Sequence, residues 1–336
     1  MTGLNWRDPS PTAGLDGSRD NSVIAVVIPC YRVLAQINTV ISHIGPEVQR
    51  IYCVDDACPD RSGRHVLATC TDPRVIVLEH SENQGVGGAT LTGYRRALAD
   101  GAHIIVKVDG DGQMDPALVR AFVTPILAGR ADYTKGNRFF RLESLKQMPL
   151  ARVLGNAFLS FLTKLSSGYW NIFDPTNGYT AIHYKVLREL PLEQLSSRWF
   201  FESDMLFRLN TLGAVVEDVP QAAQYGDEVS NLKIRQVLLE FPRKHLVNLV
   251  KRIFYNYFLR NFSLASLQLV AGTGLLLFGV IFGALKWSTS MVSGLPVSAG
   301  TVMLAALPTL LGFELLLSFL SYDISSQPRV PLHIRL

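Results

Sequence analysis

The chain has 336 residues, of which 48% are hydrophobic and 18% charged, and its formal net charge is +4 at pH 7. This length accommodates one large domain or two smaller ones. The mild positive charge is far from the strongly basic balance of nucleic-acid-binding proteins, so we expect no nucleic-acid partner. The four cysteines show no CxxC spacing and no paired histidines, and we interpret them as reduced thiols of a cytoplasmic domain.

The first 21 residues are polar and rich in Pro, Gly, Asp and Ser. They lack the basic start and the apolar centre of a signal peptide, so we do not expect export of the globular part. We interpret residues 1–21 as a disordered tail. A cytoplasmic globular domain is expected to follow over residues 22–230.

Strand-like and helix-like segments alternate from about residue 23 to residue 220. The expected strands cover residues 23–29, 50–55, 74–79, 103–109 and 132–135. This alternation predicts an α/β fold with a mainly parallel, Rossmann-like sheet and helices on both faces. Ligands of such sheets bind beyond the carboxyl ends of the strands, so the residues at those ends are the first candidates for a site.

The most informative of these strand ends is Asp109-Gly110-Asp111-Gly112-Gln113. Two carboxylates one residue apart repel each other unless a cation lies between them. A hard divalent ion such as Mg²⁺ or Mn²⁺ prefers oxygen ligands and also binds substrate phosphates. The spacing therefore predicts a metal site for a diphosphate-bearing substrate. A pair of solvated turn acids is the alternative that these five residues leave open.

Two further strand ends carry polar or glycine-rich segments. Asp55 and Asp56 end the second expected strand, where a carboxylate can accept hydrogen bonds from a base or a ribose, although Asp also caps helices. Residues 83–89 are glycine-rich and precede a helix expected over residues 90–99, so their N–H groups could meet an anion. The segment has neither the Walker pattern nor the dinucleotide-binding spacing.

Two long apolar runs near the C-terminus predict membrane insertion. Residues 264–285 carry no charge, and residues 299–322 are interrupted only by Pro308 and Glu314. At 1.5 Å per residue, a helix of about 20 residues crosses a hydrocarbon core of roughly 30 Å. We expect a two-helix transmembrane hairpin over residues 263–323 and a cytoplasmic tail over residues 324–336. Buried helices of a soluble protein are the alternative.

The basic residues predict how this hairpin is oriented. They gather before the first run and after the second, whereas the connecting loop is expected to hold only Lys286. By the positive-inside rule, the catalytic domain and both termini face the cytoplasm, on the inner (plasma) membrane. The basic residues are Lys233, Arg235, Arg243, Lys244, Lys251, Arg252 and Arg260 before the first run, and Arg329 and Arg335 after the second.

Residues 231–262 combine basic residues with apolar residues at helical spacing. We expect amphipathic helices that lie in the headgroup region, separated at Pro242, with ordinary core helices as the alternative. An ionisable group inside a span is costly, so Glu314 is a candidate functional residue, and the small residues of the first span suit close helix packing in a homo-oligomer.

Seven short segments occur in an order that resembles a known family. Together they resemble the family 2, GT-A-fold glycosyltransferases, in particular the branch of dolichol-phosphate mannosyltransferases and polyprenyl-phosphate glycosyltransferases, over about residues 23–235. The segments are Ile28-Pro29-Cys30-Tyr31, Val54-Asp55-Asp56, Asn83-Gln84-Gly85, Asp109 to Pro116, Gly136-Asn137-Arg138, Asp174 to Gly178, and Glu202-Ser203-Asp204.

The resemblance implies a function and a set of site residues. It implies metal-dependent, inverting transfer of a sugar from a GDP- or UDP-linked donor to a membrane polyprenyl phosphate, undecaprenyl or dolichyl phosphate, with Mg²⁺ or Mn²⁺ as cofactor. It implies Asp111, Asp174 and Glu202 as catalytic residues. It further implies Pro29, Tyr31, Val54, Asp56, Asp109, Gly110 and Asp111 for the nucleotide sugar; Asp109, Asp111 and Gln113 for the metal; and Arg138, Arg152 and Asn156 for the acceptor phosphate.

The chain departs from the family pattern at two points. Arg32-Val33 follows Tyr31 where members usually continue with Asn-Glu, and Val86 stands where a Lys is common. Both differences argue against assigning GDP-mannose as the donor. Two other functions remain open from the sequence: a non-catalytic, membrane-tethered scaffold that binds sugar nucleotides, and a processive polysaccharide synthase. Against the synthase, the chain lacks the Gln-x-x-Arg-Trp segment after its acidic pair.

Overall fold

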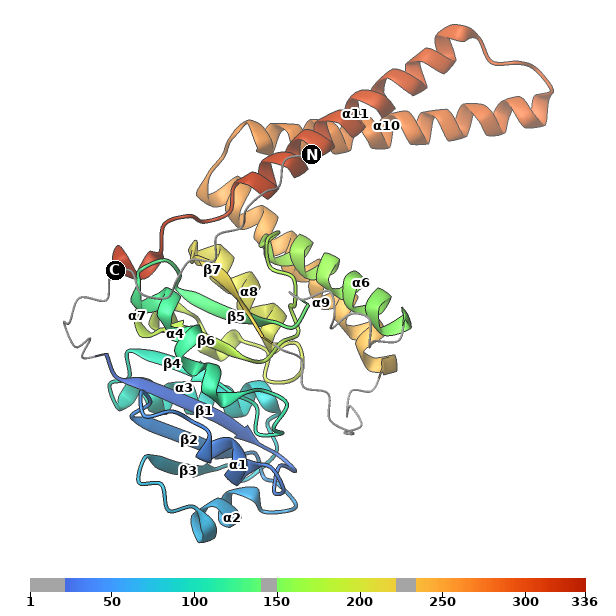
Figure 1. Cartoon of the computed structure of the whole chain (residues 1–336). Coiled ribbons are helices and arrows are strands. Elements are labelled where there is room, and N and C mark those ends of the chain that lie inside the picture. Colours follow the sequence, from blue (N-terminus) through green and yellow to red (C-terminus); the bar gives the residue numbers. More distant parts are fainter. Residues whose placement is uncertain (1–21, 140–149, 222–233) are drawn as a thin grey trace, which may run out of the picture.

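The computed structural model describes residues 22–139, 150–221 and 234–336, without the side chains of residues 150–154 and 234–239. The tail expected over residues 1–21 lies outside the described residues. Within the described part, an α/β domain is followed by one long helix and a helical hairpin that extends well beyond the domain (Figure 1).

A mixed sheet of seven strands forms the centre of the domain. The predicted fold class, an α/β fold with a mainly parallel sheet, is confirmed. The strands lie in the order β3-β2-β1-β4-β6-β5-β7, and β6 runs antiparallel to both of its neighbours. The strands are β1 (Ile24–Cys30), β2 (Arg50–Asp55), β3 (Val75–Glu79), β4 (Ile104–Lys107), β5 (Tyr133–Asn137), β6 (Thr180–His183) and β7 (Val216–Pro220).

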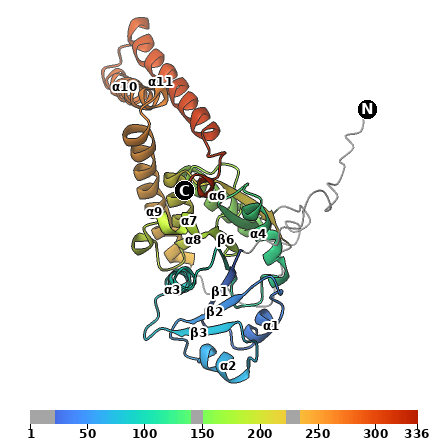
Figure 2. The ribbon, with the colours of Figure 1, turned by 90° about the vertical axis from the view of Figure 1, so that its left-hand side faces the viewer.

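Helices cover both faces of this sheet because its strands bury alternate residues on opposite sides. In β1, Ala25 and Val27 pack with α3, α7 and α8, whereas Val26 and Ile28 pack with α1, α2 and α4. Figure 2 shows the two groups of helices on either side of the strands. The helices are α1 (Ile37–Ser42), α2 (Ser62–Thr69), α3 (Val86–Ala99), α4 (Val119–Leu127), α6 (Leu150–Ser167), α7 (Tyr184–Glu189) and α8 (Phe201–Leu212).

Helix α9 (Ile234–Phe254) packs against α6 and α8 and ends in a π-helical turn, η3 (Tyr255–Arg260). The sequence predicted a break at Pro242, and this prediction was wrong: the helix continues through Pro242. The residues on either side hold it in place, since the rings of Phe241 and His245 both pack edge-on against Phe200, 5.3 and 4.9 Å between centroids.

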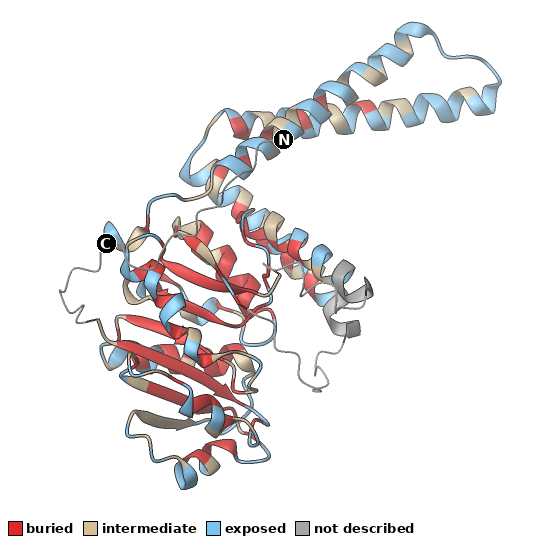
Figure 3. Cartoon of the chain, in the orientation of Figure 1, coloured by how far each residue is buried: buried red, intermediate tan, exposed pale blue. Residues whose placement is uncertain are grey.

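Helices α10 (Leu264–Ser293) and α11 (Ala299–Ser325) form an antiparallel hairpin, and both are long and apolar enough to cross a membrane. Most of their surface is exposed (Figure 3). They approach closely at glycines: a Cβ on Gly272 would lie 3.0 Å from Leu315, and one on Gly279 would lie 2.7 Å from the Ala305 carbonyl. Lys286 lies inside α10, so the connecting loop is shorter than the sequence predicted.

The segment after α11 returns to the sheet and ends in a short 3₁₀ turn, η4 (Leu332–Ile334). There Asp132, which is fully buried, accepts hydrogen bonds from the backbone N–H groups of Leu332 and His333 at 2.7 and 2.8 Å. The hairpin is therefore tied to the α/β domain at its exit as well as through α9.

Candidate functional site

The predicted site residues converge because several elements meet at one edge of the sheet. Strands β1, β2, β4 and β5 run in the same direction, so their carboxyl ends lie together. β6 runs the opposite way and begins at that edge, which brings the preceding residues 174–178 to the same place. The first turn of α8 adds Glu202, whose side chain reaches the end of β4.

The loop after β4 holds Asp109 and Asp111 in a compact turn. Asp111 Oδ1 accepts a hydrogen bond from the Gln113 N–H at 3.0 Å. Gly110 lets the loop pack closely on β1, since a Cβ there would lie 3.2 Å from Ile28 Cγ2. The Asp109 side chain is 28% exposed, so one carboxylate of the pair is partly open at the edge of the sheet.

A buried lysine joins two of the predicted acids. Lys107, 1% exposed, donates from Nζ to Asp109 Oδ1 at 2.7 Å, to the Gly178 carbonyl at 3.2 Å and to Glu202 Oε1 at 3.3 Å. Burial disfavours its charge, but the carboxylates of Asp109 and Glu202 outweigh burial and raise the pKa of Lys107 above its ordinary value. The ammonium is therefore charged and holds both acids in place. The sequence analysis missed it, although a lysine inside an apolar strand was a usable signal.

A second ion pair, between a partly exposed arginine and a buried aspartate, joins the end of β5 to residues 174–178. Arg138 donates to Asp174 from Nε at 2.7 Å and from Nη2 at 3.0 Å, a two-pronged arrangement in which Asp174 is almost fully buried. The Asn177 amide donates to the same carboxylate at 3.3 Å. Asp174 thus fixes the orientation of the guanidinium.

Lys135 on β5 is the other fully buried lysine near this edge, and it donates to the Asn177 carbonyl. Burial lowers its pKa to about 8, against the opposing pull of the Glu202 and Asp174 carboxylates. Lys107 and Lys135 therefore have pKa values shifted in opposite directions although both are enclosed. The two pKa values differ because Lys107 contacts carboxylates, whereas Lys135 contacts a backbone carbonyl.

The chemistry of these donors fits a hard divalent cation. No group of three or more His, Cys, Asp or Glu side chains that could enclose a metal occurs in the described part of the chain. Mg²⁺, however, is commonly held by one or two carboxylates and completes its shell with water and substrate phosphates. Asp109 and Asp111, on one turn at an open edge, provide such a partial set of ligands.

Asp56, at the end of β2, is buried and organises the glycine-rich segment before α3. Its carboxylate accepts hydrogen bonds from the N–H groups of Gln84 and Gly85 at 2.8 and 2.7 Å, and pairs with His80 Nδ1 at 2.8 Å. These N–H groups, which the sequence suggested for an anion, bind Asp56 instead. Helix α3 begins at Val86, earlier than predicted, directly after this anchored turn.

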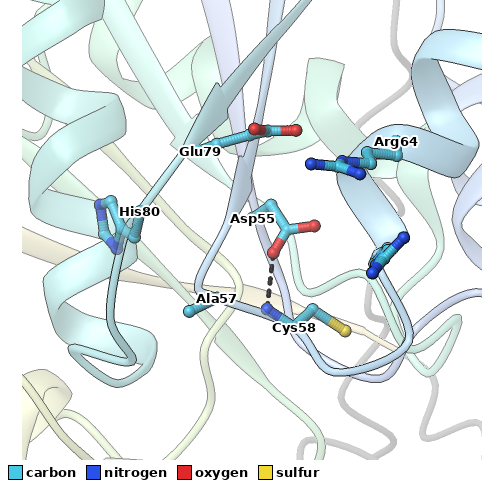
Figure 4. Close-up of a pocket in the computed structure, with 7 residues that line it drawn as sticks. Asp55, Ala57, Cys58, Arg64, Glu79 and His80 are labelled. Atoms are coloured by element: carbon cyan, nitrogen blue, oxygen red, sulfur yellow. Dashed lines mark hydrogen bonds between the residues drawn. The ribbon is translucent and has the colours of Figure 1, made fainter.

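A cavity of about 130 Å³ adjoins the same strand ends (Figure 4). Asp55 lies at its centre and caps α2, accepting from the N–H groups of Cys58 at 2.7 Å and Gly63 at 2.6 Å. Ala57 and Arg61 on this rim both have φ near +50°, at 50° and 53°. Such strain in non-glycine residues gathers at functional sites.

The remaining predicted residues differ in accessibility. Tyr31 is 43% exposed beside the end of β1, whereas Pro29 and Val54 are buried within the sheet and can meet a ligand only through their backbone. Asn156 is partly exposed on α6. Arg152 lies on the same helix, but its side chain is outside the described residues.

Comparison with known proteins agrees with this arrangement. Residues 25–191 match the family model described as glycosyl transferase family 2. The chain is also 31% identical over 192 residues to the UDP-N-acetylglucosamine–dolichyl-phosphate N-acetylglucosaminyltransferase of Methanococcus voltae, covering 53% of this chain and 76% of that protein. The chain belongs to glycosyl transferase family 2. It is therefore a glycosyltransferase, as the ordered segments predicted.

A second relative of this family 2 glycosyltransferase is the undecaprenyl-phosphate mannosyltransferase of Micrococcus luteus. It is 28% identical over 201 residues, which cover 59% of this chain and 82% of that protein. Both matches cover less than two thirds of this chain.

The solved structures with similar folds include glucosyl-3-phosphoglycerate synthase from Mycobacterium tuberculosis. Its complex with Mn²⁺, UDP and glucosyl-3-phosphoglycerate has a TM-score of 0.54 at 20% identity, covering 74% of this chain and 86% of that one. Its complex with Mg²⁺ and UDP has a TM-score of 0.53 at 20% identity, covering 69% and 79%. At this identity, the likeness establishes the fold.

Proposed function

We propose that this glycosyltransferase transfers a sugar from a nucleotide sugar, GDP- or UDP-linked, to a polyprenyl phosphate in the membrane. The two relatives above are named for dolichyl-phosphate and undecaprenyl-phosphate acceptors. The observation that carries the proposal is the pairing of an acid-rich sheet edge with a hairpin long and apolar enough to span a bilayer. A lipid acceptor cannot leave the bilayer, so the enzyme has to meet its phosphate there.

The proposed roles divide along the edge of the sheet. The backbone of Pro29 and Val54, with Tyr31 and Gly110, lines the nucleotide site, and Asp56 shapes it by fixing the glycine-rich turn. Asp109 and Asp111, with Gln113, hold Mg²⁺ or Mn²⁺, which supplies positive charge beside the donor diphosphate. The acceptor phosphate is bound by Arg138, Arg152 and Asn156.

Catalysis in this proposal depends on positioning and charge. The acceptor phosphate is anionic near neutral pH, so no strong base is needed to activate it. An acceptor oxygen forms a bond to the anomeric carbon while the bond from that carbon to the diphosphate oxygen breaks, and the nucleoside diphosphate leaves with the bonding electrons. A single displacement of this kind inverts the anomeric centre. Product NMR that shows retained configuration would exclude it.

Two enclosed residues prepare this reaction. Asp174 orients the Arg138 guanidinium so that its planar fork can meet a phosphate. The Lys107 ammonium donates to both Asp109 and Glu202 and so keeps the two carboxylates close together. Asp111, Asp174 and Glu202 are then the groups closest to the sugar and the acceptor.

The proposal also places the protein at the membrane. We propose that α10 and α11 span the inner membrane, with the catalytic domain and both termini in the cytoplasm. Exposed apolar side chains on α9 support contact between this helix and the bilayer surface: Leu246, Val250 and Phe254 recur every four residues and are more than half exposed. The glycines of α10 pack against α11 within one hairpin, so we propose that contacts between subunits of a homo-oligomer use other surfaces of the hairpin. The exposed side chain of Glu314 lies on one such surface.

The test is a transfer assay with purified protein in detergent, undecaprenyl phosphate, Mn²⁺ and a panel of labelled GDP- and UDP-sugars. We expect one donor class to give a labelled product that partitions into organic solvent. Release of free labelled sugar without any lipid product, for every donor, would contradict the proposed acceptor.

A further inference from the structure

The last turn of α11 carries an acid that is buried rather than solvated. Asp323 is 3% exposed, although it lies at the end of a helix whose surface is otherwise mostly open. An isolated buried carboxylate is very costly, so its partners have to compensate its charge. These partners come from three separate segments that precede the hairpin in the chain.

Asp323 receives hydrogen bonds from a helix, a turn and a loop. Arg252 of α9 donates to both of its oxygens, at 2.6 and 3.0 Å, and is equally buried. The Tyr257 hydroxyl of η3 donates at 2.6 Å, and the Trp170 indole N–H donates at 3.0 Å. Two-pronged arginine–carboxylate contacts fix direction as well as distance, so this cluster restrains the end of α11 in orientation.

The same arginine also reaches the end of α6. Arg252 Nη2 donates to the Leu165 carbonyl at 2.9 Å, and its guanidinium lies over Gly168, where a Cβ would be 2.6 Å from Nη1. Gly168 has a φ of 79°, which favours glycine. Positive charge at the carboxyl end of a helix is favourable. Arg252 of α9 therefore contacts the ends of both α6 and α11.

The loop that contacts Asp323 leads directly into the candidate site. Trp170 donates from its backbone N–H to Gln327 Oε1 at 3.1 Å, which gives the loop a second contact with the end of the hairpin. Four residues further along the chain is Asp174, the partner of Arg138. A short, anchored connection therefore joins the membrane hairpin to the group that orients the proposed acceptor arginine.

From this cluster we infer that Asp323, with Arg252, is a positioning residue for the lipid acceptor. It fixes the angle between the membrane hairpin and the edge of the sheet, so that Arg138 and Asp174 face the plane in which a lipid phosphate lies. The inference rests on the proposed polyprenyl-phosphate acceptor. Separating the buried Arg252–Asp323 pair would leave an uncompensated charge in the interior, which is strongly destabilising. The contact between the end of α11 and α9 is therefore rigid.

The distinguishing experiment compares two acceptors with one set of variants. One acceptor is undecaprenyl phosphate in lipid vesicles that contain the reconstituted enzyme, and the other is a short, water-soluble isoprenyl phosphate. The soluble acceptor can diffuse to the site whatever the angle of the hairpin, whereas the bilayer-bound acceptor cannot. The variants are Asp323→Asn and the milder Trp170→Phe, which removes one hydrogen bond and keeps the ion pair.

Asp100→Asn is the matched control. Asp100 likewise accepts from a tyrosine hydroxyl, Tyr52 at 2.7 Å, and pairs with two arginines, Arg50 and Arg96, at 3.0 and 2.9 Å. It lies at the end of α3, away from the hairpin. Asp100 is more open than Asp323, 18% against 3% exposed, so this variant reports the loss of an arginine- and tyrosine-bound aspartate at a more solvated place.

For Asp323→Asn we expect kcat/KM with the bilayer acceptor to fall roughly tenfold to a hundredfold, since misplacement by about 1 Å costs about a hundredfold. With the soluble acceptor, kcat/KM changes by less than about twofold, as for substitutions that leave the site intact. Trp170→Phe shows the same selectivity with a smaller loss, and Asp100→Asn shows none. Equal losses with both acceptors, or no loss with either, would overturn the inference. Wild-type enzyme that labels neither acceptor would overturn the proposed function with it.

Discussion

Replacing each of the two buried lysines by methionine is expected to have different consequences, because only one of them contacts carboxylates. Lys107→Met leaves Asp109 and Glu202 without their shared ammonium, and removing one partner of a buried ion pair costs about 3–5 kcal/mol. Lys135→Met removes a single hydrogen bond to the Asn177 carbonyl, worth about 0.5–1.5 kcal/mol, and this loss is opposed by relief of the burial that lowers the pKa of Lys135. Methionine has a similar length and leaves no large cavity in either place.

Thermal unfolding of the purified variants measures this difference. For a domain of this size, a loss of 1 kcal/mol lowers the midpoint by roughly 2–4 °C, so Lys107→Met should unfold about 6–20 °C below wild type and Lys135→Met only a few degrees below it. Equal midpoints for the two variants, or a Lys107→Met protein as stable as wild type, would refute the assignment of charge to Lys107.

The pH dependence provides a second readout from the same proteins. The pKa of Lys135 is lowered to about 8 in the folded protein, so the unfolded chain binds more protons between about pH 8 and pH 10.5. Stability from this group therefore rises as pH increases through that window, by at most about 3 kcal/mol. Lys135→Met should lose this slope, and a variant that keeps the full wild-type slope would contradict it.

Three other substitutions test neighbouring parts of the account. Asp56→Ala frees the N–H groups that fix the glycine-rich turn, so we expect KM for the nucleotide sugar to rise with little loss of kcat; an unchanged KM in steady-state assays would count against this role. Arg138→Lys loses the two-pronged contact with Asp174, and we expect the acceptor KM to rise about tenfold while the donor KM stays constant. Burial raises the pKa of Asp218 to about 6, so stability should fall as pH rises from about 4 to about 6; Asp218→Asn should flatten that slope in pH-dependent unfolding, and an unaltered slope would contradict the cause.

Hydrophobic pattern was sufficient to predict the strands that carry the site. β1, β2 and β4 are short, mainly apolar runs with polar residues at or within two positions of their ends, and both features are visible without knowing the fold. The carboxyl ends of parallel strands share an edge, so Asp56 and Asp109 were expected near one another. β6 and β7 were missed because β6 gains its place only by pairing with β4 and β5, and β7 only by pairing with β5.

Long-range charge contacts were beyond sequence reasoning. Lys107 and Glu202 are 95 residues apart, and Arg252 and Asp323 are 71 apart, so no local spacing links either pair. At Pro242 the local sequence predicted a feature that the structure does not have. Its lack of an N–H predicted a break, but contacts between Phe241, His245 and Phe200 keep the helix intact, since tertiary packing outweighs a local preference.

The central claim is that neighbouring acids at the sheet edge bind a divalent ion that is needed to move a sugar onto a lipid phosphate. Reconstituted wild-type enzyme, Asp109→Asn and Asp111→Asn should be compared for labelled sugar extracted into organic solvent, with Mn²⁺ titrated against a chelator. We predict lipid labelling by wild type only when the metal is present, and losses of at least about a hundredfold in both variants, equal to about 2.7 kcal/mol of transition-state stabilisation. Full labelling in chelator, or by either variant, would contradict the claim.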